Sequence, residues 1–336
     1  INNGIHPGEP EGIDASMMLA RDVLTKPAYR KLLDSVIICI IPIYNIDGSL
    51  NTSNFYRANQ NGPSNPAFRG NAQNRDLNRD FIKCDTRNAS ALIHFIQQCN
   101  PDVFIDTHTS NGADYQYTMT YIATQKDKLN PVLAQYLSQQ FQPVLEDKMK
   151  KRGFPLSPYV NEMKTIPDSG IAGFLETPRY STGYTTLFNT IGFVTETHML
   201  KAFDKRVEAT YDFLLTTLEI MKKDAGQIKK ARKTAIANTL AAKNYPINYA
   251  LDTTHYSLLN FTGYESGYKN SEISALPRLY YDRTKPFTKK VRFYNHYIAT
   301  DSIQKPIAYI IPQAYQQVIQ RLKESGVILQ QLEKDT

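Results

Sequence analysis

Four side chains in this sequence are of the types that bind and use a metal ion. His6 and Glu9 stand three residues apart in GIHPGE, and the proline and glycine between them favour a tight turn that points both side chains the same way. His108 and Glu196 each follow an apolar stretch. Two histidines and a carboxylate suit Zn²⁺, whose catalytic sites use three protein ligands and leave a place for water. His6, Glu9 and His108 supply such a set for one Zn²⁺ per chain, although the H-x-x-E pair taken alone also fits a structural or surface role.

A second polar group lies in a long loop at residues 45–85, within the stretch NRDLNRDF. Asn78 and Arg79 are adjacent there, and an arginine beside an amide is suited to binding a free carboxylate. The same stretch could instead be a loop held together by its own Asp–Arg pairs. Taken alone, this stretch supports both interpretations equally.

The elements that must position these residues are strands that alternate with helices. The continuous apolar run in residues 35–48 predicts a strand buried on both faces, as in a parallel sheet, which Pro42 and the following NIDG end. Ligands of open α/β sheets bind beyond the carboxyl ends of the strands, where His108 and Glu196 would lie. We predict an α/β fold with a mixed, largely parallel central sheet flanked by helices, and a smaller β-rich C-terminal region. Further strands are predicted at 101–112, 115–124 and 191–198, and helices at 14–24, 88–100, 130–151 and 201–223.

The chain changes character near residues 225–235. A basic run at 222–233 is typical of a solvated helix end or linker. Residues 235–312 are then rich in Tyr, Thr and Asn, with short stretches of alternating polarity that predict strands, and a terminal helix should follow them. We predict a catalytic domain at 1–228 and a β-rich accessory region at 229–336.

The composition argues against several classes of protein. The net charge is +7 and the isoelectric point about 9.0, but the basic run contains no aromatic residues, so we expect no nucleic-acid partner. No stretch reaches the 18 or so apolar residues of a membrane span, so we expect no transmembrane segment. Cys39, Cys84 and Cys99 lack C-x-x-C spacing, so free thiols are expected and at most one internal disulfide can form. No feature indicates the oligomeric state.

Five stretches of the sequence occur in an order that resembles one family. They are GIHPGEPEG, PIYNIDG, FRGNAQNRDLNRDF, DTHTSNG and TETH, and they are spread over residues 4–200. Together they look like the zinc carboxypeptidases of the carboxypeptidase A type. The resemblance implies a zinc metallopeptidase, a hydrolase that cleaves the C-terminal peptide bond of a peptide with a free C-terminus. It also implies that the nucleophile is a water activated by the zinc.

The resemblance assigns a role to each matching residue. The two histidines and the glutamate named above match the three zinc ligands. Glu196 matches the catalytic glutamate that acts as general base. Asn78 and Arg79 match the pair that binds the terminal carboxylate of the substrate. Asp76 matches a carboxylate that orients His6, a partner that zinc-bound histidines usually have.

Other residues are matched with alternatives. Arg69 in FRGN best matches the arginine that polarises the scissile carbonyl, and Arg57 in YRAN is the alternative. The mobile tyrosine of the family corresponds to Tyr184 or Tyr180, of which we prefer Tyr184. His198 comes two residues after the catalytic glutamate and shares its strand face, and we expect it mainly to pack.

Different functions fit the same residues. N-acyl amino acid deacylases resemble this sequence in their H-x-x-E and D-L-N-R features, and the peptide substrate could also be a cell-wall fragment. A non-catalytic binding module of the same fold is a further alternative, but every expected polar position is filled. A turn such as GIHPGE normally follows a strand, so we expect N-terminal strands that are missing from this sequence. We favour a periplasmic or secreted location.

Overall fold

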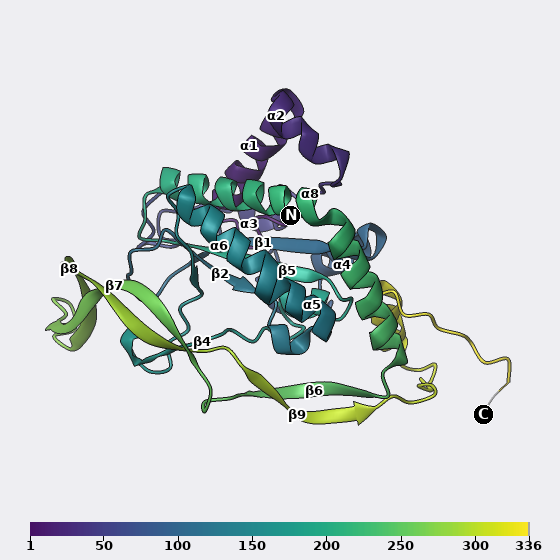
Figure 1. Cartoon of the computed structure of the whole chain (residues 1–336). Coiled ribbons are helices and arrows are strands. Elements are labelled where there is room, and N and C mark those ends of the chain that lie inside the picture. Colours follow the sequence, from purple (N-terminus) through teal and green to yellow (C-terminus); the bar gives the residue numbers. More distant parts are fainter. Residues whose placement is uncertain (335–336) are drawn as a thin grey trace.

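The central sheet of the protein is mixed and largely parallel (Figure 1). The computed structural model describes residues 1–334. Strands β1 (Val103–Ser110) and β5 (Ile191–His198) pair in parallel, β2 (Met119–Ala123) runs antiparallel to β5, and β3 (Ser157–Pro158) is parallel to β2. Asn2 forms parallel bridges to β1 on one side and to Ile41 on the other. The predicted α/β class is confirmed, and three of the predicted strands are present.

Helices cover both faces of this sheet (Figure 1). Apolar residues of one face, such as Ile105 and Phe193, pack against the helices that contribute Leu133, Leu145 and Phe213. Alternate residues of β1 point to the opposite face, so Phe104 packs against the helix that contributes Ile93. The helices on the first face are α1 (Glu11–Thr25), α5 (Pro131–Tyr136), α6 (Gln142–Lys151) and α8 (Phe203–Ala241). The helices on the second face are α4 (Arg87–Cys99) and α7 (Ser181–Thr186). Two further helices, α2 (Pro27–Arg30) and α3 (Ile46–Ser49), have only four residues each.

The predicted strand at residues 35–48 is wrong for most of its length. Only Ile41 forms a bridge, through Asn2, and α3 begins at Ile46, within the NIDG stretch that was expected to end the strand. Ile37 is 92% exposed, so the run is not buried on both faces. The physical reason is its place at the edge of the sheet, where residues 1–3 pair with one side of the segment and, among residues 1–334, no strand pairs with the other.

The structure has no domain boundary at residues 225–235, where the sequence predicted one. Helix α8 continues from Phe203 to Ala241, and Ala231 and Ala235 belong to the same apolar core as the sheet. The predicted division at residue 228 therefore falls inside a helix, and the change from helix to strand comes at Asn244. The basic run does not end the helix because some of its members are buried: Arg232 is only 6% exposed. No helix within residues 1–334 combines the length and apolar character needed to cross a bilayer.

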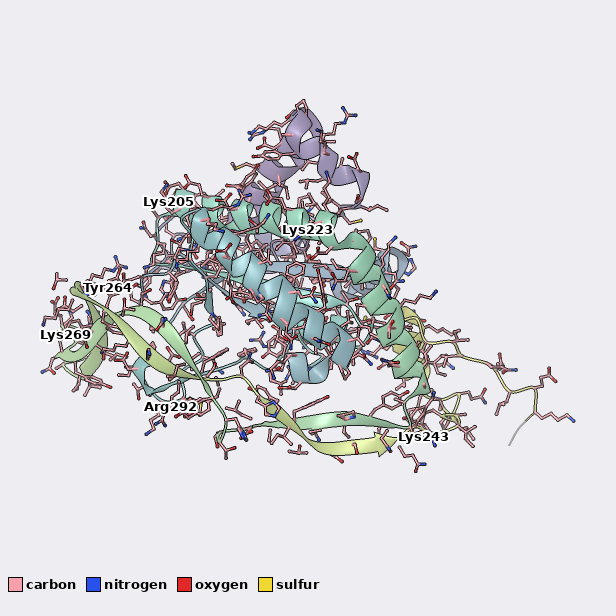
Figure 2. The ribbon with its side chains drawn as sticks, in the orientation of Figure 1. Lys205, Lys223, Lys243, Tyr264, Lys269 and Arg292 are labelled. Atoms are coloured by element: carbon pink, nitrogen blue, oxygen red, sulfur yellow. The ribbon has the colours of Figure 1, made fainter. Side chains whose placement is uncertain are left out.

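The C-terminal region forms two small sheets beside the main body (Figure 1). Strands β7 (Ser257–Asn270) and β8 (Pro277–Tyr294) form a long antiparallel hairpin to which β4 (Ile171–Ala172) adds in parallel. Strands β6 (Asn244–Leu251) and β9 (Tyr297–Gln304) form the second sheet, and helix α9 (Gln316–Glu324) follows. The basic side chains labelled in Figure 2 lie at separate places on α8, on the hairpin and just before β6.

Candidate metal centre

A tight turn aims His6 and Glu9 at the same point. The backbone N–H of Glu9 donates a hydrogen bond to the carbonyl of His6 over 2.9 Å, which closes a turn through Pro7 and Gly8. A side chain at position 8 is excluded, because an added Cβ would lie 2.5 Å from the carbonyl oxygen of Ala67. The sequence GIHPGE therefore folds as predicted, with both potential ligands on one side of the turn.

The strand register brings His108 and Glu196 together. His108 on β1 is the direct partner of Glu196 on β5, and the two strands are parallel, so both side chains rise from the same face of the sheet. On the antiparallel side, Glu196 pairs with Thr120 of β2. The candidate ligand and the candidate base thus lie on neighbouring strands near their carboxyl ends.

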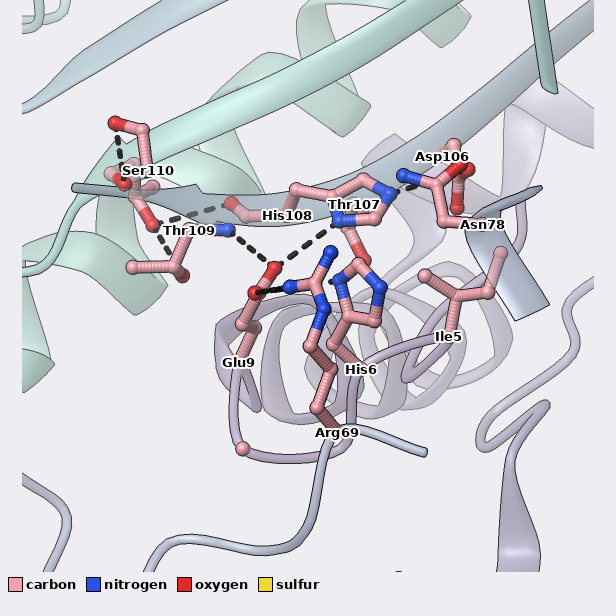
Figure 3. Close-up of polar contacts among 12 residues, drawn as sticks. Ile5, His6, Glu9, Arg69, Asn78, Asp106, Thr107, His108, Thr109 and Ser110 are labelled. Atoms are coloured by element: carbon pink, nitrogen blue, oxygen red, sulfur yellow. Dashed lines mark hydrogen bonds and ion pairs between the residues drawn. The ribbon is translucent and has the colours of Figure 1, made fainter. Parts of the chain in front are cut away.

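His6, Glu9 and His108 turn toward one another and form a possible metal site (Figure 3). Their ligand atoms all lie within 4.8 Å of one another, and all three residues are buried. The Nδ1 atom of His6 lies 3.3 Å from one Glu9 oxygen, and the Nδ1 atom of His108 lies 3.0 Å from the other. Among the described residues, Nδ1 of His6 is buried without a hydrogen-bond partner. This donor set fits Zn²⁺, which prefers nitrogen and carboxylate ligands in a four-coordinate shell.

The outer nitrogens of both histidines face carboxylates. Nε2 of His6 lies 2.9 Å from Asp76, and Nε2 of His108 lies 3.2 Å from Asp106. Such partners fix the ring orientation and leave Nδ1 free to bind the metal. Asp76 was predicted for this role, whereas Asp106 was missed. The signal for Asp106 is its position two residues before His108 on a strand, which places both side chains on one face.

Charge complementarity holds the centre together. Burial alone would raise the pKa of Glu9, but the neighbouring His6 and Arg57 and a hydrogen bond from His108 hold it well below its usual value. Burial alone would lower the pKa of His108, but Asp106 and Glu9 raise it well above the ordinary value. Glu9 also accepts a hydrogen bond from the backbone N–H of Thr109 over 2.9 Å. Glu9 therefore supplies a negative charge that His6, His108 and Arg57 all contact.

Asp76 joins the metal centre to the predicted carboxylate-binding pair. One of its oxygens accepts the backbone N–H of Asn78 and also faces His6, so Asp76 begins the single helical turn at Leu77–Arg79. Leu77 anchors this turn in the apolar core beneath it. The Oδ1 atom of Asn78 is buried without a hydrogen-bond partner among residues 1–334. The guanidinium of Arg79 stacks over the ring of Tyr180 at 4.5 Å.

The structure places both candidate arginines beside Glu9. Arg57 lies 2.8 Å from Glu9 and donates a second hydrogen bond to the carbonyl of Thr109. Arg69 lies 3.6 Å from Glu9 and directs two nitrogens at Asp76. The contact with Glu9 is shorter for Arg57, which was the alternative, than for the preferred Arg69.

The packing of the two candidate tyrosines favours Tyr180 over Tyr184. Tyr184 is 1% exposed and packs between Phe81 and Phe188 in the apolar core. It cannot turn toward a substrate without leaving that core. Tyr180 lies over Arg79 instead, so the packing favours Tyr180, the alternative, over the preferred Tyr184.

Glu196 lies in an electrostatically crowded environment. Burial raises the pKa of its carboxyl to about 8, the charge of His108 opposes this rise, and the carboxylates of Glu9 and Glu176 add to it. Glu176 itself is buried and accepts hydrogen bonds from the backbone N–H and the hydroxyl of Thr182. A carboxylate with a raised pKa beside a candidate metal site is typical of a proton-transferring group.

A buried ion pair lies next to the turn that carries His6 and Glu9. Glu11 at the start of α1 lies 2.5 Å from Arg206 near the start of α8, and neither side chain is more than 2% exposed. Arg206 also donates hydrogen bonds to the carbonyls of Asn61, Gly62, Met199 and Lys201. One guanidinium therefore joins α1, the long loop and the end of β5 around the metal centre.

The fold and the site together place a possible metal-binding centre on an α/β scaffold. Residues 1–166, slightly less than half of the chain, match the family model described as zinc carboxypeptidase. The matched residues include the three candidate ligands, Asp76, Asn78 and Arg79, whereas Glu196 lies beyond them. No curated protein sequence matches the chain.

Solved structures of metallopeptidases are similar to this chain. A metallo-carboxypeptidase from Pseudomonas aeruginosa, in complex with (2-guanidinoethylmercapto)succinic acid, is 13% identical with a TM-score of 0.48, and the match covers 68% of this chain and 56% of that one. This chain thus spans little more than half the length of that protein. The tripeptide-bound cell shape determinant Csd4 protein from Helicobacter pylori is 13% identical with a TM-score of 0.40, over 89% of this chain and 73% of that one.

Proposed function

We propose that this chain is a zinc metallocarboxypeptidase that removes the C-terminal residue of a peptide. The observation that supports this most directly is the arrangement around Asp76. One carboxylate contacts the ligand His6, the arginine Arg69 and the turn that presents Asn78 and Arg79. A group suited to a free carboxylate thus lies next to a site suited to zinc.

The metal has a defined place in this proposal. His6, Glu9 and His108 would hold it, and Asp76 and Asp106 would orient the two imidazoles. When bound, zinc would supply Lewis-acid polarisation of the reacting carbonyl and water.

The protein side chains perform the remaining tasks. Arg79 and Asn78 bind the terminal carboxylate and so place the last peptide bond near the metal centre. Glu196 accepts a proton from the attacking water at its carboxylate and returns a proton to the leaving amine. Arg57 or Arg69 donates hydrogen bonds to the carbonyl oxygen as negative charge develops on it.

A paired substrate assay tests the proposal. The same peptides are offered with a free and with an amidated C-terminus, with and without a zinc chelator, and the products are read by mass spectrometry. We expect release of single C-terminal residues from the free peptides only, and loss of that release with the chelator. Equal cleavage of amidated and free peptides would contradict the carboxypeptidase assignment.

A matched pair of arginine variants sharpens this assay. Arg79→Ala should raise KM for free peptides by roughly 10- to 100-fold, because a charge-assisted hydrogen bond is worth about 1.5–3 kcal/mol. Arg75→Ala is the control, because Arg75 lies on the same loop and is exposed. Equal effects of the two substitutions would show that Arg79 does not bind the carboxylate.

The alternative deacylase function uses the same assembly of residues. A panel of N-acyl amino acids beside the peptides separates the two, since a deacylase would favour the acyl amino acids. Cell-wall peptide fragments belong in the same panel, because the geometry of the metal centre does not distinguish among peptides.

A further inference from the structure

Two cysteines that are 60 positions apart in the sequence meet at the edge of the sheet. The Sγ atoms of Cys39 and Cys99 lie 3.9 Å apart. Cys39 belongs to the edge segment at residues 35–41, and Cys99 is the last residue of α4. The two sulfurs of a disulfide are about 2.0 Å apart, so these two thiols lie close enough to be candidates for a cross-link.

Both ends of this pair are held in place by other contacts. The carbonyl of Cys39 accepts a hydrogen bond from the backbone nitrogen of Ile1, and the next residue but one, Ile41, pairs with Asn2. On the other side, Asn100 ends α4, and its backbone and side-chain oxygens accept hydrogen bonds from Arg232 of α8. The short distance between the sulfurs is therefore set by the fold and not by two free loops.

The pair is also accessible from solvent. Cys99 is exposed and Cys39 is partly exposed, and both line an apolar groove of about 280 Å³ between the edge segment, α4 and α8. Cys84 differs in each respect, because it is buried and its thiol donates to Glu324 over 3.1 Å. The third cysteine thus serves as an internal control.

We propose that Cys39 and Cys99 form a disulfide that closes the loop carrying the carboxylate-binding residues. The residues between the two cysteines include Arg57, Arg69 and the turn with Asn78 and Arg79. The cross-link would restrict the unfolded chain and not the folded site, because it joins two positions that the fold already holds together. It goes beyond the proposed peptidase activity and does not depend on it.

The oxidation balances with a low-molecular-weight disulfide such as oxidised glutathione. The Cys99 thiolate attacks one sulfur of the oxidant, forms a mixed disulfide and releases one glutathione thiol. The Cys39 thiolate then attacks Sγ of Cys99 and releases the second glutathione. Two protein thiols lose two protons and two electrons, and one disulfide oxidant becomes two thiols. Such a cross-link persists in oxidising compartments.

Thiol counting on the full chain tests the proposal. The reduced protein is incubated with oxidised glutathione, denatured and alkylated with N-ethylmaleimide, and its mass is measured. We expect one alkylated thiol, at Cys84, no retained glutathione, and a linked pair of peptides containing Cys39 and Cys99. Alkylation of both Cys39 and Cys99, or glutathione retained on Cys99 beside an alkylated Cys39, would overturn the proposal.

Variants separate this pairing from general oxidation. In Cys84→Ser the pair should still form, so no thiol remains to be alkylated. In Cys99→Ser, a change at an exposed helix end, Cys39 and Cys84 should both remain free. The oxidised wild type should melt roughly 5–10 °C above the reduced form because of the long loop that is closed, and this difference should vanish in Cys99→Ser. Equal melting temperatures of oxidised and reduced wild type would also contradict the proposal.

Discussion

The metal centre and the β7–β8 hairpin are built in different ways. In the metal centre every candidate ligand has two or more polar partners, and buried carboxylates join elements that are far apart in the sequence. The hairpin rests mainly on one apolar cluster, in which Phe261 packs against Tyr115 and Tyr117. The two regions meet at Tyr115, which packs against Phe261 of the hairpin and lies edge-on to His198 at the end of β5. The ring centroids of Tyr115 and His198 are 4.6 Å apart. The metal centre thus depends on a buried polar network, whereas the hairpin combines apolar packing with hydrogen bonds and ion pairs near its surface, such as Gln116 to Gly263 and Lys289 to Asp168.

The largest effect is expected at the base of the proposed reaction. Glu196→Gln should lower kcat by about 10²–10⁴-fold, because general base catalysis contributes that much, while zinc content stays near one per chain. Turnover assays and metal analysis measure the two quantities. Glu208→Gln is a matched control on the exposed side of α8. Near-normal turnover in Glu196→Gln would show that the proton goes elsewhere.

A core substitution tests whether the hairpin stands apart from the metal centre. Phe261 is fully buried, so Phe261→Ala should reduce the free energy of unfolding by about 3–5 kcal/mol. Urea denaturation measures this loss, and metal analysis of the folded variant should still find one zinc. Loss of zinc from the folded variant would mean that the hairpin supports the ligands and that the two regions are not independent.

The contact between the two regions should respond to pH. Burial lowers the pKa of His198 to about 4, so between pH 6.5 and about 4 the unfolded chain binds more protons than the folded one. Stability should therefore fall as the pH falls through this window, by up to about 3 kcal/mol from this residue. Unfolding measured from pH 7 to 4.5 should show a weaker acid dependence in His198→Asn. His94→Asn, exposed on α4, should leave the acid dependence unchanged.

The carboxylates behind the two histidines should have smaller effects. Asp76→Asn and Asp106→Asn should each weaken zinc binding by roughly 10- to 100-fold, because each removes the partner that orients a ligand. Competition with a zinc chelator measures both affinities. Asp34→Asn, at an exposed position, is the control. An unchanged affinity in Asp106→Asn would restrict the orienting role to Asp76.

The sequence predicted the centre of the fold better than its margins. His6, Glu9 and His108 could be predicted because several spaced motifs together resemble one family, whereas the H-x-x-E spacing alone left a structural role open. Asp106 was missed because a carboxylate in an apolar strand has no distinctive spacing of its own.

Long-range contacts account for the other errors. The run at residues 35–48 was assigned to the interior because its composition is apolar, but position at the edge of a sheet is decided by pairing partners far away in the sequence. The end of α8 was placed too early because a run of lysines resembles a solvated helix end, and nothing local shows that Arg232 binds Asn100. Tyr184 was preferred for the site because local sequence does not distinguish a loop tyrosine from one packed in the core.

Helix α8 sets a fixed length inside the molecule. Its residue Arg206 binds Glu11 beside the metal-binding turn, and its residue Arg232 binds the chain at the end of α4. The two arginines are 26 residues apart, which corresponds to about 39 Å of helix length at 1.5 Å per residue, and the helix curves between them (Figure 1). The helix thus connects the metal-binding turn to the far end of α4 through one continuous element. An insertion of one residue between the two arginines would rotate one end by about 100° relative to the other, and both attachments could not then be kept.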